Sequence, residues 1–534
     1  MRVPRARRMI FVDVRAALLA FRSQPYFQLR PILRRRELPA IPEIRVGACN
    51  DQPIRPEKDF VLYWMIAFRR THSNFALDHA IEQARELKKP LVILEALRCD
   101  YPWASDRLHQ FVLQGMAEKL RDLAGREVLY HPYVERTVGE GKGLLAALAD
   151  RSCVVITDDF PCFFLPRMIR SAAKQVSVRL EKIDSNGLLP LRATDQVFST
   201  AYAFRRFLQK NVPPHLSHFP KADPLARLSL PRLKSLPMEI IKRWPSAPLS
   251  WLENPKSLAE LPINHRILPA EIRGGEAAAQ EKWREFLTQK LDRYTEARNE
   301  PDQEGSSGLS PYLHFGHISA HQMFHDLMSR EKWSDAKLAH RASGSLEGWW
   351  GVRPPVEQFL DQLITWREVG FNFSSHRDDY DRYESLPAWA QHTLAKHRRD
   401  ERQWIYSLKD FAAARTHDPL WNAAQRQLST TGHMHNYLRM LWGKKILEWS
   451  GTPQQALEIL IELNNRYALD GRNPNSYSGI FWCLGRYDRP WGPERPIFGT
   501  VRYMSSANTA RKLHVNEYLR KYGEQKTSFR EIED

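Results

Sequence analysis

Eleven prolines between positions 212 and 270 divide the chain into two unlike parts. Proline fixes φ and removes a backbone donor, so this interval excludes long helices and strands and is predicted to be a linker between domains. A chain of 534 residues is long enough for two domains, because single cores rarely grow beyond about 250–300 residues. The prolines are Pro213, Pro214, Pro220, Pro224, Pro231, Pro237, Pro245, Pro248, Pro255, Pro262 and Pro269.

Strand and helix patterns alternate upstream of the prolines. The runs 60–67, 91–97, 127–130 and 154–158 are typical of buried strands. Helical patterns separate them, one beginning at a Ser73 cap and the others covering 111–120 and 143–150. This alternation predicts a mainly parallel sheet with helices on both faces, in a Rossmann-like α/β domain. Ligands of such sheets bind beyond the carboxyl ends of the strands.

The pattern downstream of Gly274 and Gly275 is helical almost to the end of the chain. Aromatic residues recur there at helical spacing, and no strand-like alternation is present. We therefore expect an all-helical second domain. The expected organisation is a basic N-terminal extension (1–56), an α/β domain (57–190), a linker (191–274) and a helical domain (275–534).

The extension is rich in arginine, and Asp13 is the single acid within residues 1–36. This composition resembles an organellar transit peptide, and it equally fits a disordered basic arm or a misassigned start. An apolar h-region with a small-residue cleavage site is lacking, so secretory export is disfavoured.

The charge balance is strongly basic, with 79 Lys and Arg against 62 Asp and Glu. The net charge of +17 suits a nucleic-acid partner, although a solvated basic surface would give the same balance. No apolar run approaches the roughly 18 residues of a membrane span, so membrane insertion is disfavoured. The five cysteines lack CxxC spacing, which favours neither a metal site nor disulfides and fits a reducing compartment.

A serine-rich segment, GSSGLSPYLHFGHIS at 305–319, places hydroxyls before the start of a predicted helix. Free amides at a helix N-terminus, with Ser306, Ser307 and Ser310 nearby, can cradle a phosphate. A serine-capped turn without a ligand is the alternative interpretation of this segment alone.

Five further segments carry a family resemblance. They are EQFLDQLITWRE at 357–368, DPLWNAAQ at 418–425, MHNYLRMLWGKKILEW at 434–449, LNNRYALDGRNPNSY at 463–477 and ERPIFGTVRYM at 494–504. In this order they resemble the flavin-binding core of the photolyase/cryptochrome superfamily, most closely the class II cyclobutane pyrimidine dimer (CPD) photolyases. The region 59–111 is similar to the antenna domain of that family.

The resemblance implies FAD as cofactor, folded in a pocket of the helical domain. The family's diphosphate-binding residues correspond to Tyr294, Ser306, Ser307, Gly308, Leu309 and Ser310, and Arg367 corresponds to a further FAD contact. Arg439 and Asp470 resemble the ion pair beside the isoalloxazine, where a fixed positive charge favours an anionic reduced ring. Asn464 resembles the asparagine near flavin N5. Class II relatives suggest a deazaflavin-type antenna chromophore, with an empty first domain as the alternative.

Four aromatic residues match the family's photoreduction chain. The counterpart of Trp442 is nearest the flavin, that of Trp421 is next and that of Trp449 is outermost, with Tyr406 an associated tyrosine. Trp442 and Trp449 are seven residues apart, so on one helix they share a face and lie roughly 10.5 Å apart along its axis. Without the flanking match, ordinary core tryptophans would explain this spacing.

Several residues match positions that contact damaged DNA in the family. Trp366 and Trp482 correspond to the aromatic rings beside the flipped-out lesion, and Met440 to the methionine of dimer-repairing enzymes. Arg502 resembles a residue inserted near the gap in the duplex, and Arg495 is a candidate phosphate contact. Lys444 and Lys445 could also be solvated surface charges.

The sequence departs from the family pattern at Gln362, where dimer photolyases typically carry a glutamate. An amide donates and accepts hydrogen bonds but cannot supply a proton. Asp361 is a poor substitute, because helical neighbours point about 100° apart. Glutamine at this position is typical of (6-4) photolyases, but their paired histidines correspond here to Asn436 and Met440, with His433 and His435 out of register. A glycine is more usual than Asn436 in class II sequences.

The combined interpretation is light-driven repair of CPDs in DNA by electron transfer from photoexcited reduced FAD. The alternatives are a (6-4) photolyase or a cryptochrome-type photoreceptor, both favoured by Gln362. We expect UV-damaged DNA as partner, no metal, no membrane association, no obligate protein partner and a monomer. A cytoplasmic or other DNA-containing reducing compartment fits, and the basic N-terminus leaves organellar targeting open.

Overall fold

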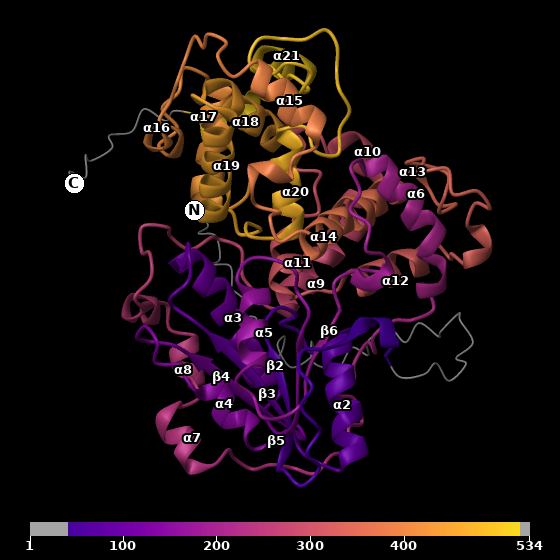
Figure 1. Cartoon of the computed structure of the whole chain (residues 1–534), viewed down its shortest axis with the longest axis vertical. Coiled ribbons are helices and arrows are strands. Elements are labelled where there is room, and N and C mark those ends of the chain that lie inside the picture. The colour runs from indigo at the N-terminus through magenta and orange to yellow at the C-terminus, as the bar shows by residue number, and fades with distance from the viewer. Residues whose placement is uncertain (1–40, 524–534) are drawn as a thin grey trace, which may run out of the picture. The chain divides into compact units, whose positions relative to one another are not determined.

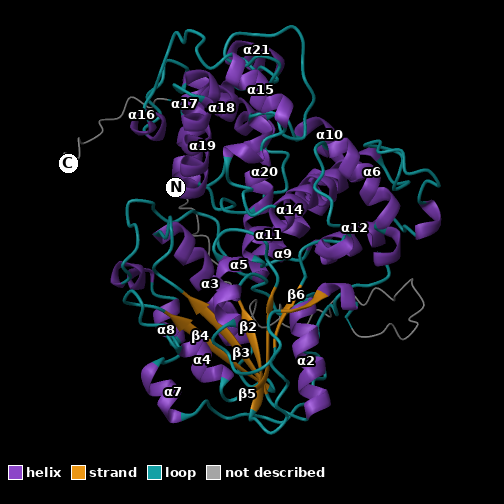
Figure 2. Cartoon of the chain, viewed as in Figure 1, coloured by secondary structure: helices purple, strands orange, loops and turns teal. Residues whose placement is uncertain are grey.

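The computed structural model describes residues 41–523 of the chain, and its N-terminal part is built on a six-stranded sheet (Figure 2). The strand order is β1-β6-β5-β2-β3-β4. β1 pairs antiparallel with β6, whereas all other neighbours run parallel, so the predicted mainly parallel sheet is confirmed. The strands are β1 (Val46–Ala48), β2 (Phe60–Met65), β3 (Leu91–Leu97), β4 (Val128–Val134), β5 (Ser152–Asp158) and β6 (Leu180–Ile183).

Helices connect the parallel strands and pack against the sheet (Figure 1). α2 contacts β2, β5 and β6, α3 contacts β3 and β4, and α4 contacts β5. β2 and β5 are buried along their whole length, as expected of strands covered on both faces. The helices are α2 (Phe75–Leu87), α3 (Asp106–Asp122), α4 (Leu144–Ala149) and α5 (Leu165–Ala173).

The N-cap of α2 is Asn74 and not Ser73. The Asn74 side-chain oxygen accepts hydrogen bonds from the backbone N–H groups of Ala76 and Leu77. Ser73 instead has a φ of 48°, in the left-handed region. Serine and asparagine are both strong N-caps, so their adjacency leaves the start of the helix undetermined by sequence.

The sequence patterns missed β1 and β6, which are three and four residues long. No residue of β1 is buried, and in β6 two polar, partly buried residues separate the buried Leu180 and Ile183, so neither strand has the buried run that marks β2 or β5. β1 lies within the interval 1–56 that we assigned to the basic extension, so the sheet begins upstream of the expected domain start. The predictions made for residues 1–36 concern a segment outside the described residues.

The proline-rich interval contains no helix longer than six residues, as its composition predicts. Its helices are α7 (Met238–Arg243) and α8 (Leu249–Leu252), and α6 (Ala201–Asn211) precedes them. The segment contributes to both apolar cores. Leu236 and Trp244 pack with the core of the sheet, and Trp251 and Leu258 pack with the core of the helical part.

The remainder of the described chain is helical and contains no strand between residues 184 and 523. Proline occupies the first turn of α13, α17, α19 and α20, where its missing N–H costs no hydrogen bond. The helices are α9 (Glu276–Glu285), α10 (Tyr294–Ala297), α11 (Ser310–Phe315), α12 (Ala320–Arg330), α13 (Pro354–Leu360), α14 (Arg367–His376), α15 (Ala388–Lys396), α16 (Leu408–Ala412), α17 (Pro419–Thr431), α18 (Asn436–Trp449), α19 (Pro453–Tyr467), α20 (Pro474–Cys483), α21 (Ser506–Lys512) and α22 (Asn516–Tyr522).

A close approach of α14 and α20 organises the helical core. Gly370 lies against the start of α20, where a Cβ would come within 2.8 Å of the Pro474 carbonyl oxygen. α18 packs in turn against α17, α19 and α20. These contacts bring the segments that carry the family resemblance together around one cavity.

Side chains also join the helical part to the sheet. Phe371 and Tyr477 pack with the apolar core of the sheet, and Phe111 of α3 lies 5.3 Å from Tyr312, between ring centroids. The buried carboxylate of Glu368 accepts hydrogen bonds from the backbone N–H groups of residues 188 and 189 at 2.8 and 3.1 Å. The cavity-lining helix α14 is thus anchored to the segment that follows β6.

Candidate functional site: a cavity in the helical part

A cavity of about 450 Å³ lies among α10, α14, α18, α19 and α20. Its volume is within the range of sites for small molecules and cofactors. Most of the residues singled out by sequence meet here. The predicted residues that line it are Tyr294, Ser307, Ser310, Gln362, Trp366, Arg367, Asn436, Arg439, Met440, Trp442, Asn464, Asp470, Trp482 and Arg502.

A π-helical turn, Asp361–Trp366, joins α13 to α14 and presents two of these residues to the cavity. Within 361–370 only Gln362 and Trp366 are partly exposed. Asp361 is buried elsewhere and forms an ion pair with Arg205, at 2.7 Å between Oδ1 and Nε. Asp361 therefore cannot replace the carboxylate missing at Gln362. In the part of the chain that the structure describes, the Gln362 amide has no hydrogen-bond partner and is free to engage a ligand.

Arg439 and Asp470 form an ion pair on the cavity wall. Nη2 lies 3.1 Å from Oδ1 and Nη1 lies 3.3 Å from Oδ2, a two-point contact. Ser310 also donates to Oδ2, at 2.8 Å. Burial raises the pKa of Asp470, but the Arg439 charge and the donated hydrogen bonds outweigh it and lower the pKa to about 2. The pair is therefore ionised across the physiological pH range.

Asn464 lies on α19 with its amide nitrogen fixed toward the protein. Its Nδ2 donates to Ser476 Oγ at 2.6 Å and to Asn465 Oδ1 at 3.3 Å. Among the hydrogen bonds of residues 41–523, none is accepted by the carbonyl oxygen of this amide. An acceptor on the wall of the cavity is thus available to a ligand N–H.

The serine segment enters the cavity only in part. Ser307 and Ser310 line it, whereas Ser306, Gly308 and Leu309 do not. Leu309 is fully buried in the helical core, because the turn that starts α11 directs its side chain inward, so no side-chain contact with a ligand is available to it.

Sequence reasoning missed several polar residues of the cavity. Arg298 and Asn299 follow α10, and the others lie at the start of α20. The RNPNS run at 472–476 carried a usable signal, since asparagine before proline is typical of a helix start. Asn473 is indeed the N-cap of α20. The missed residues are Arg298, Asn299, Asn473, Asn475, Ser476 and Ser478.

The four redox-chain candidates form a connected series leading out of the cavity. Trp442 lines the cavity, and Trp421 donates its indole N–H to the Trp442 carbonyl at 3.1 Å. The ring centroids of Trp421 and Trp449 are 6.0 Å apart, and those of Trp449 and Tyr406 are 5.8 Å apart. The spatial order agrees with the order that the resemblance implies.

A second hollow, of about 620 Å³, adjoins the cavity mouth. Met440, Trp482 and Arg502 line both spaces, and Arg495 lines the second one alone. The two arginines that we assigned to DNA contact thus lie on the same side as Trp482.

Lys444 and Lys445 are not solvated, which corrects one interpretation of the sequence. Lys444 has no exposed surface; its Nζ donates to the Cys483 carbonyl at 2.8 Å and lies 4.8 Å from the centroid of the Trp482 ring. Lys445 pairs with Glu448 at 2.6 Å. Both lysines follow the cavity-lining part of α18 and turn into the core. The Cys483 carbonyl and the Trp482 ring contact the Lys444 ammonium, and the Glu448 carboxylate and the Trp449 ring contact that of Lys445.

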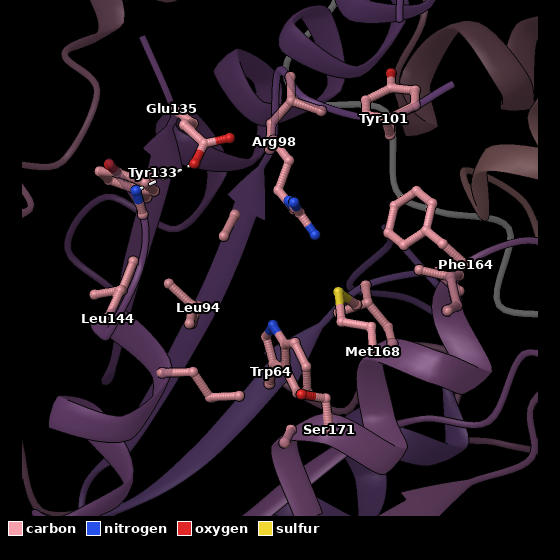
Figure 3. A pocket seen from close by; sticks show the side chains of 18 of the residues that line it. Trp64, Leu94, Arg98, Tyr101, Tyr133, Glu135, Leu144, Phe164, Met168 and Ser171 are labelled. Carbon is pink, nitrogen blue, oxygen red and sulfur yellow. Dashed lines mark hydrogen bonds between the residues drawn. The ribbon is translucent and has the colours of Figure 1, made fainter. Parts of the chain in front are cut away.

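A third cavity, of about 650 Å³, opens at the carboxyl ends of the parallel strands (Figure 3). Trp64, Arg98 and Tyr133 come from the ends of β2, β3 and β4, and Met168 comes from α5. Figure 3 shows the Arg98 side chain pointing into this space. The position is the one expected for a ligand of a parallel sheet.

The described residues form neither a metal-binding cluster nor a membrane-spanning helix. Within residues 41–523, no group of three or more His, Cys, Asp or Glu side chains is arranged to hold a metal ion. No helix in the same range combines the length and hydrophobicity needed to cross a membrane.

Solved structures share this fold. A bacterial class III photolyase from Agrobacterium tumefaciens superposes with a TM-score of 0.59 at 18% identity, covering 87% of this chain and 86% of that one. A cryptochrome from Synechocystis sp. gives a TM-score of 0.61 at 14% identity, covering 87% and 88%. The architecture is thus that of photolyases and cryptochromes.

Curated relatives narrow the assignment. A deoxyribodipyrimidine photo-lyase of Methanothermobacter thermautotrophicus is 36% identical over 89% of this chain and 97% of its own length. One from Arabidopsis thaliana is 31% identical over 88% of this chain and 89% of its own. No family model matches the sequence. These relatives show that the chain belongs to the photolyase/cryptochrome superfamily and is one of its photolyases.

Proposed function

We propose that this protein splits cyclobutane pyrimidine dimers in DNA, using light and a reduced FAD held in the helical cavity. The observation that supports this most is the meeting of the Arg439–Asp470 pair, Trp366, Trp482 and Met440 around one cavity that opens toward Arg495 and Arg502. Relatives named deoxyribodipyrimidine photo-lyase support the same reaction.

The residues present fit a flavin. The cavity offers a fixed positive charge at Arg439, an unengaged acceptor at Asn464 and hydroxyls at Ser307 and Ser310. Arg367, whose Nη1 donates to the Asn186 carbonyl at 2.7 Å, adds a second cation to the wall. These groups suit an electron-rich ring and a diphosphate. When bound and reduced, FAD supplies the light-excitable one-electron donor.

The protein's own residues position the lesion and set the local field. Trp366 and Trp482 offer indole faces for stacking an extruded dimer. Arg439, fixed by its ion pair with Asp470, stabilises negative charge that develops in the cavity. The Gln362 amide can hydrogen-bond a pyrimidine carbonyl but cannot transfer a proton to it. Arg495 contacts a DNA phosphate and Arg502 inserts near the gap that the flipped-out lesion leaves, so the two arginines hold the duplex at the cavity mouth.

Gln362 also supports two competing functions. A (6-4) photolyase would use glutamine at this position, but none of the histidines within residues 41–523 lines the helical cavity, and His435 is buried outside it. A cryptochrome-type photoreceptor would keep the redox chain without the glutamate. The aromatic pair and the two arginines at the mouth favour repair over the photoreceptor, and the lack of histidine among the described residues of the cavity lining favours the CPD over the (6-4) lesion.

We assign the third cavity to an antenna chromophore of the deazaflavin type. Its aromatic and apolar lining, with Trp64, Tyr101 and Phe163, suits a planar ring, and Arg98 can pair with an acidic group on the chromophore.

The test is illumination of the FAD-loaded, reduced protein with two oligonucleotides in parallel, one carrying a CPD and one a (6-4) lesion. Chromatography of the products is expected to show light-dependent reversal of the CPD alone. Reversal of the (6-4) lesion alone would contradict the proposal that the CPD is the substrate. Reversal of neither lesion would favour a photoreceptor function.

A further inference from the structure

A four-residue aromatic cluster surrounds the outer end of the tryptophan series. His417, which the sequence did not single out, lies between Trp449 and Trp404, with ring centroids 4.9 and 4.6 Å from its own. Tyr406 contacts Trp449 on the same side, at 5.8 Å. Its backbone N–H donates to the Trp449 carbonyl at 3.1 Å, which fixes the loop against α18.

Tyr406 and His417 are joined by two hydrogen bonds at one oxygen. The backbone N–H of His417 donates to Tyr406 Oη at 3.0 Å, and Oη lies 2.8 Å from His417 Nδ1. Because the oxygen accepts a hydrogen bond from the backbone N–H, its own O–H group is left to donate to Nδ1. A neutral imidazole with its proton on Nε2 accepts there. No other protein partner of this hydroxyl occurs in the described chain, so Nδ1 of His417 is the protein acceptor placed to receive the phenol proton.

The indole N–H groups of the two inner tryptophans donate to oxygens that are not bases. Trp442 donates its indole N–H to the Gln425 side-chain oxygen at 2.9 Å, and Trp421 donates to a peptide carbonyl. An amide or peptide oxygen accepts a hydrogen bond but does not take up a proton near neutral pH. The inner positions can therefore pass electrons only, whereas the Tyr406 position can also pass a proton.

We propose that His417 is the proton acceptor that allows Tyr406 to be oxidised at the end of the tryptophan series, an inference that rests on the proposed flavin photochemistry. Trp449, present as the radical cation after giving up an electron inward, takes one electron from Tyr406. The O–H bond of Tyr406 breaks and its proton forms a bond with Nδ1. The products are neutral Trp449, a neutral tyrosyl radical and an imidazolium.

Proton uptake makes the transfer directional. An oxidised phenol is a very strong acid, so electron transfer without proton loss would be uphill and would quickly reverse. The distance of 2.8 Å is within the range required for proton transfer to a general base. His417 is exposed, so the imidazolium can release its proton to water, and a thiol or another one-electron reductant in solution can then reduce the tyrosyl radical.

Trp404 positions the imidazole. Its ring stacks on His417 with an interplanar angle of 19°, and 43% of the residue remains exposed. The stack holds Nδ1 toward Tyr406. Trp404→Phe keeps a ring that can stack on His417, so it is the matched control for substitutions of His417.

The decisive experiment is flash photolysis of the full chain carrying oxidised FAD, followed by optical and electron paramagnetic resonance detection of radicals. In the wild type we expect tryptophan radicals to give way to a neutral tyrosyl radical, with a rate about two- to threefold lower in D2O. His417→Gln keeps a hydrogen-bond acceptor but no base, and is expected to lower the tyrosyl yield at least fivefold. Imidazole added to His417→Gly should restore part of that yield, because the site is exposed.

A measurement without flavin adds an independent readout. Nitrogen NMR of the His417 ring in the flavin-free protein is expected to show the tautomer protonated at Nε2 with Nδ1 as acceptor, and Tyr406→Phe is expected to shift the Nδ1 signal. An Nδ1-protonated neutral ring in the wild type would overturn the inference.

The outcomes distinguish a failure of the proposed role of His417 from a failure of the proposed flavin photochemistry. Tryptophan radicals without a tyrosyl radical in the wild type would overturn the role of His417 alone, as would a wild-type tyrosyl yield and isotope effect in His417→Gln. If the wild type forms no tryptophan radical at all, the proposed flavin photochemistry is wrong and this inference with it.

Discussion

The guanidinium of Arg439 on α18 meets the carboxylate of Asp470, which follows α19, in a two-point ion pair with 3.1 and 3.3 Å between nitrogen and oxygen. The pair joins two segments that are 31 residues apart and holds a positive charge against the cavity. Ser310 on α11 adds a third contact through its hydroxyl. One carboxylate thus links three parts of the cavity wall.

Asp470→Asn is expected to remove an acid-sensitive part of the stability. The pKa of Asp470 is lowered to about 2 in the folded protein, below its ordinary value of 3.8. A lowered carboxyl pKa contributes stability above pH 4 that is lost as the pH falls from about 4 toward 2. The free energy of unfolding of the wild type minus that of Asp470→Asn should fall by about 2 kcal/mol over that range. Urea denaturation of the flavin-free proteins between pH 6 and 2.5 measures this difference, and parallel curves would contradict it.

Lys444→Met is expected to change the alkaline side of the stability profile. Burial lowers the pKa of Lys444 to about 8, so between pH 8 and 10.5 the unfolded chain binds a proton that the folded protein has released. Stability therefore rises with pH in that window, and the wild type should gain about 3 kcal/mol relative to Lys444→Met.

Denaturation at pH 7 to 10.5 measures this gain. Lys174→Met, which removes an exposed ammonium, is the matched control. If the difference in free energy of unfolding between the wild type and Lys444→Met did not change with pH, the prediction that Lys444 loses its proton near pH 8 in the folded protein would be wrong.

Gln362→Glu is expected to raise the yield of dimer splitting per absorbed photon. A carboxyl at this position can share a proton with the lesion, whereas the amide cannot. The measurement is the quantum yield of CPD reversal by the FAD-loaded, reduced protein. Gln52→Glu, at an exposed position far from the cavity lining, controls for added charge. A lower yield in Gln362→Glu than in the wild type would show that the amide serves another task.

Trp482→Leu is expected to weaken binding of dimer-containing DNA about 5- to 150-fold, because stacking on an aromatic side chain contributes roughly 1–3 kcal/mol per base. Binding of undamaged duplex should change little, since the indole lines the cavity that receives the lesion, whereas the phosphate contact Arg495 lies outside that cavity. Kd values measured in the dark for both duplexes test this. Trp404→Leu removes an indole outside the cavity, and an equal loss in both variants would argue against stacking of the lesion.

Much of the fold followed from local sequence patterns. The mainly apolar runs of β2, β3 and β5 identified three strands of the sheet, and the aromatic residues at helical spacing identified the second part of the chain as helical. The short strands β1 and β6 were missed because their pairing, and not their own hydrophobicity, holds them in the sheet.

The candidate site was predicted largely through family resemblance, and what remained hidden depends on tertiary contacts. The burial of Lys444 follows from the position of the Cys483 carbonyl on another helix. The contact of His417 with Tyr406 bridges a loop between residues 11 apart, and no sequence spacing encodes it. Asn299 likewise reaches the cavity from the turn after α10, a position that only the folded chain reveals.

The central claim is that the helical cavity holds one flavin, and equilibrium dialysis of FAD against the flavin-free protein tests it most directly. The account predicts uptake of one FAD per chain, with the absorption spectrum of a bound flavin, and weaker uptake by Arg439→Met, which removes the positive charge from the cavity wall. A folded protein that takes up no FAD would contradict the account, however tightly it binds DNA.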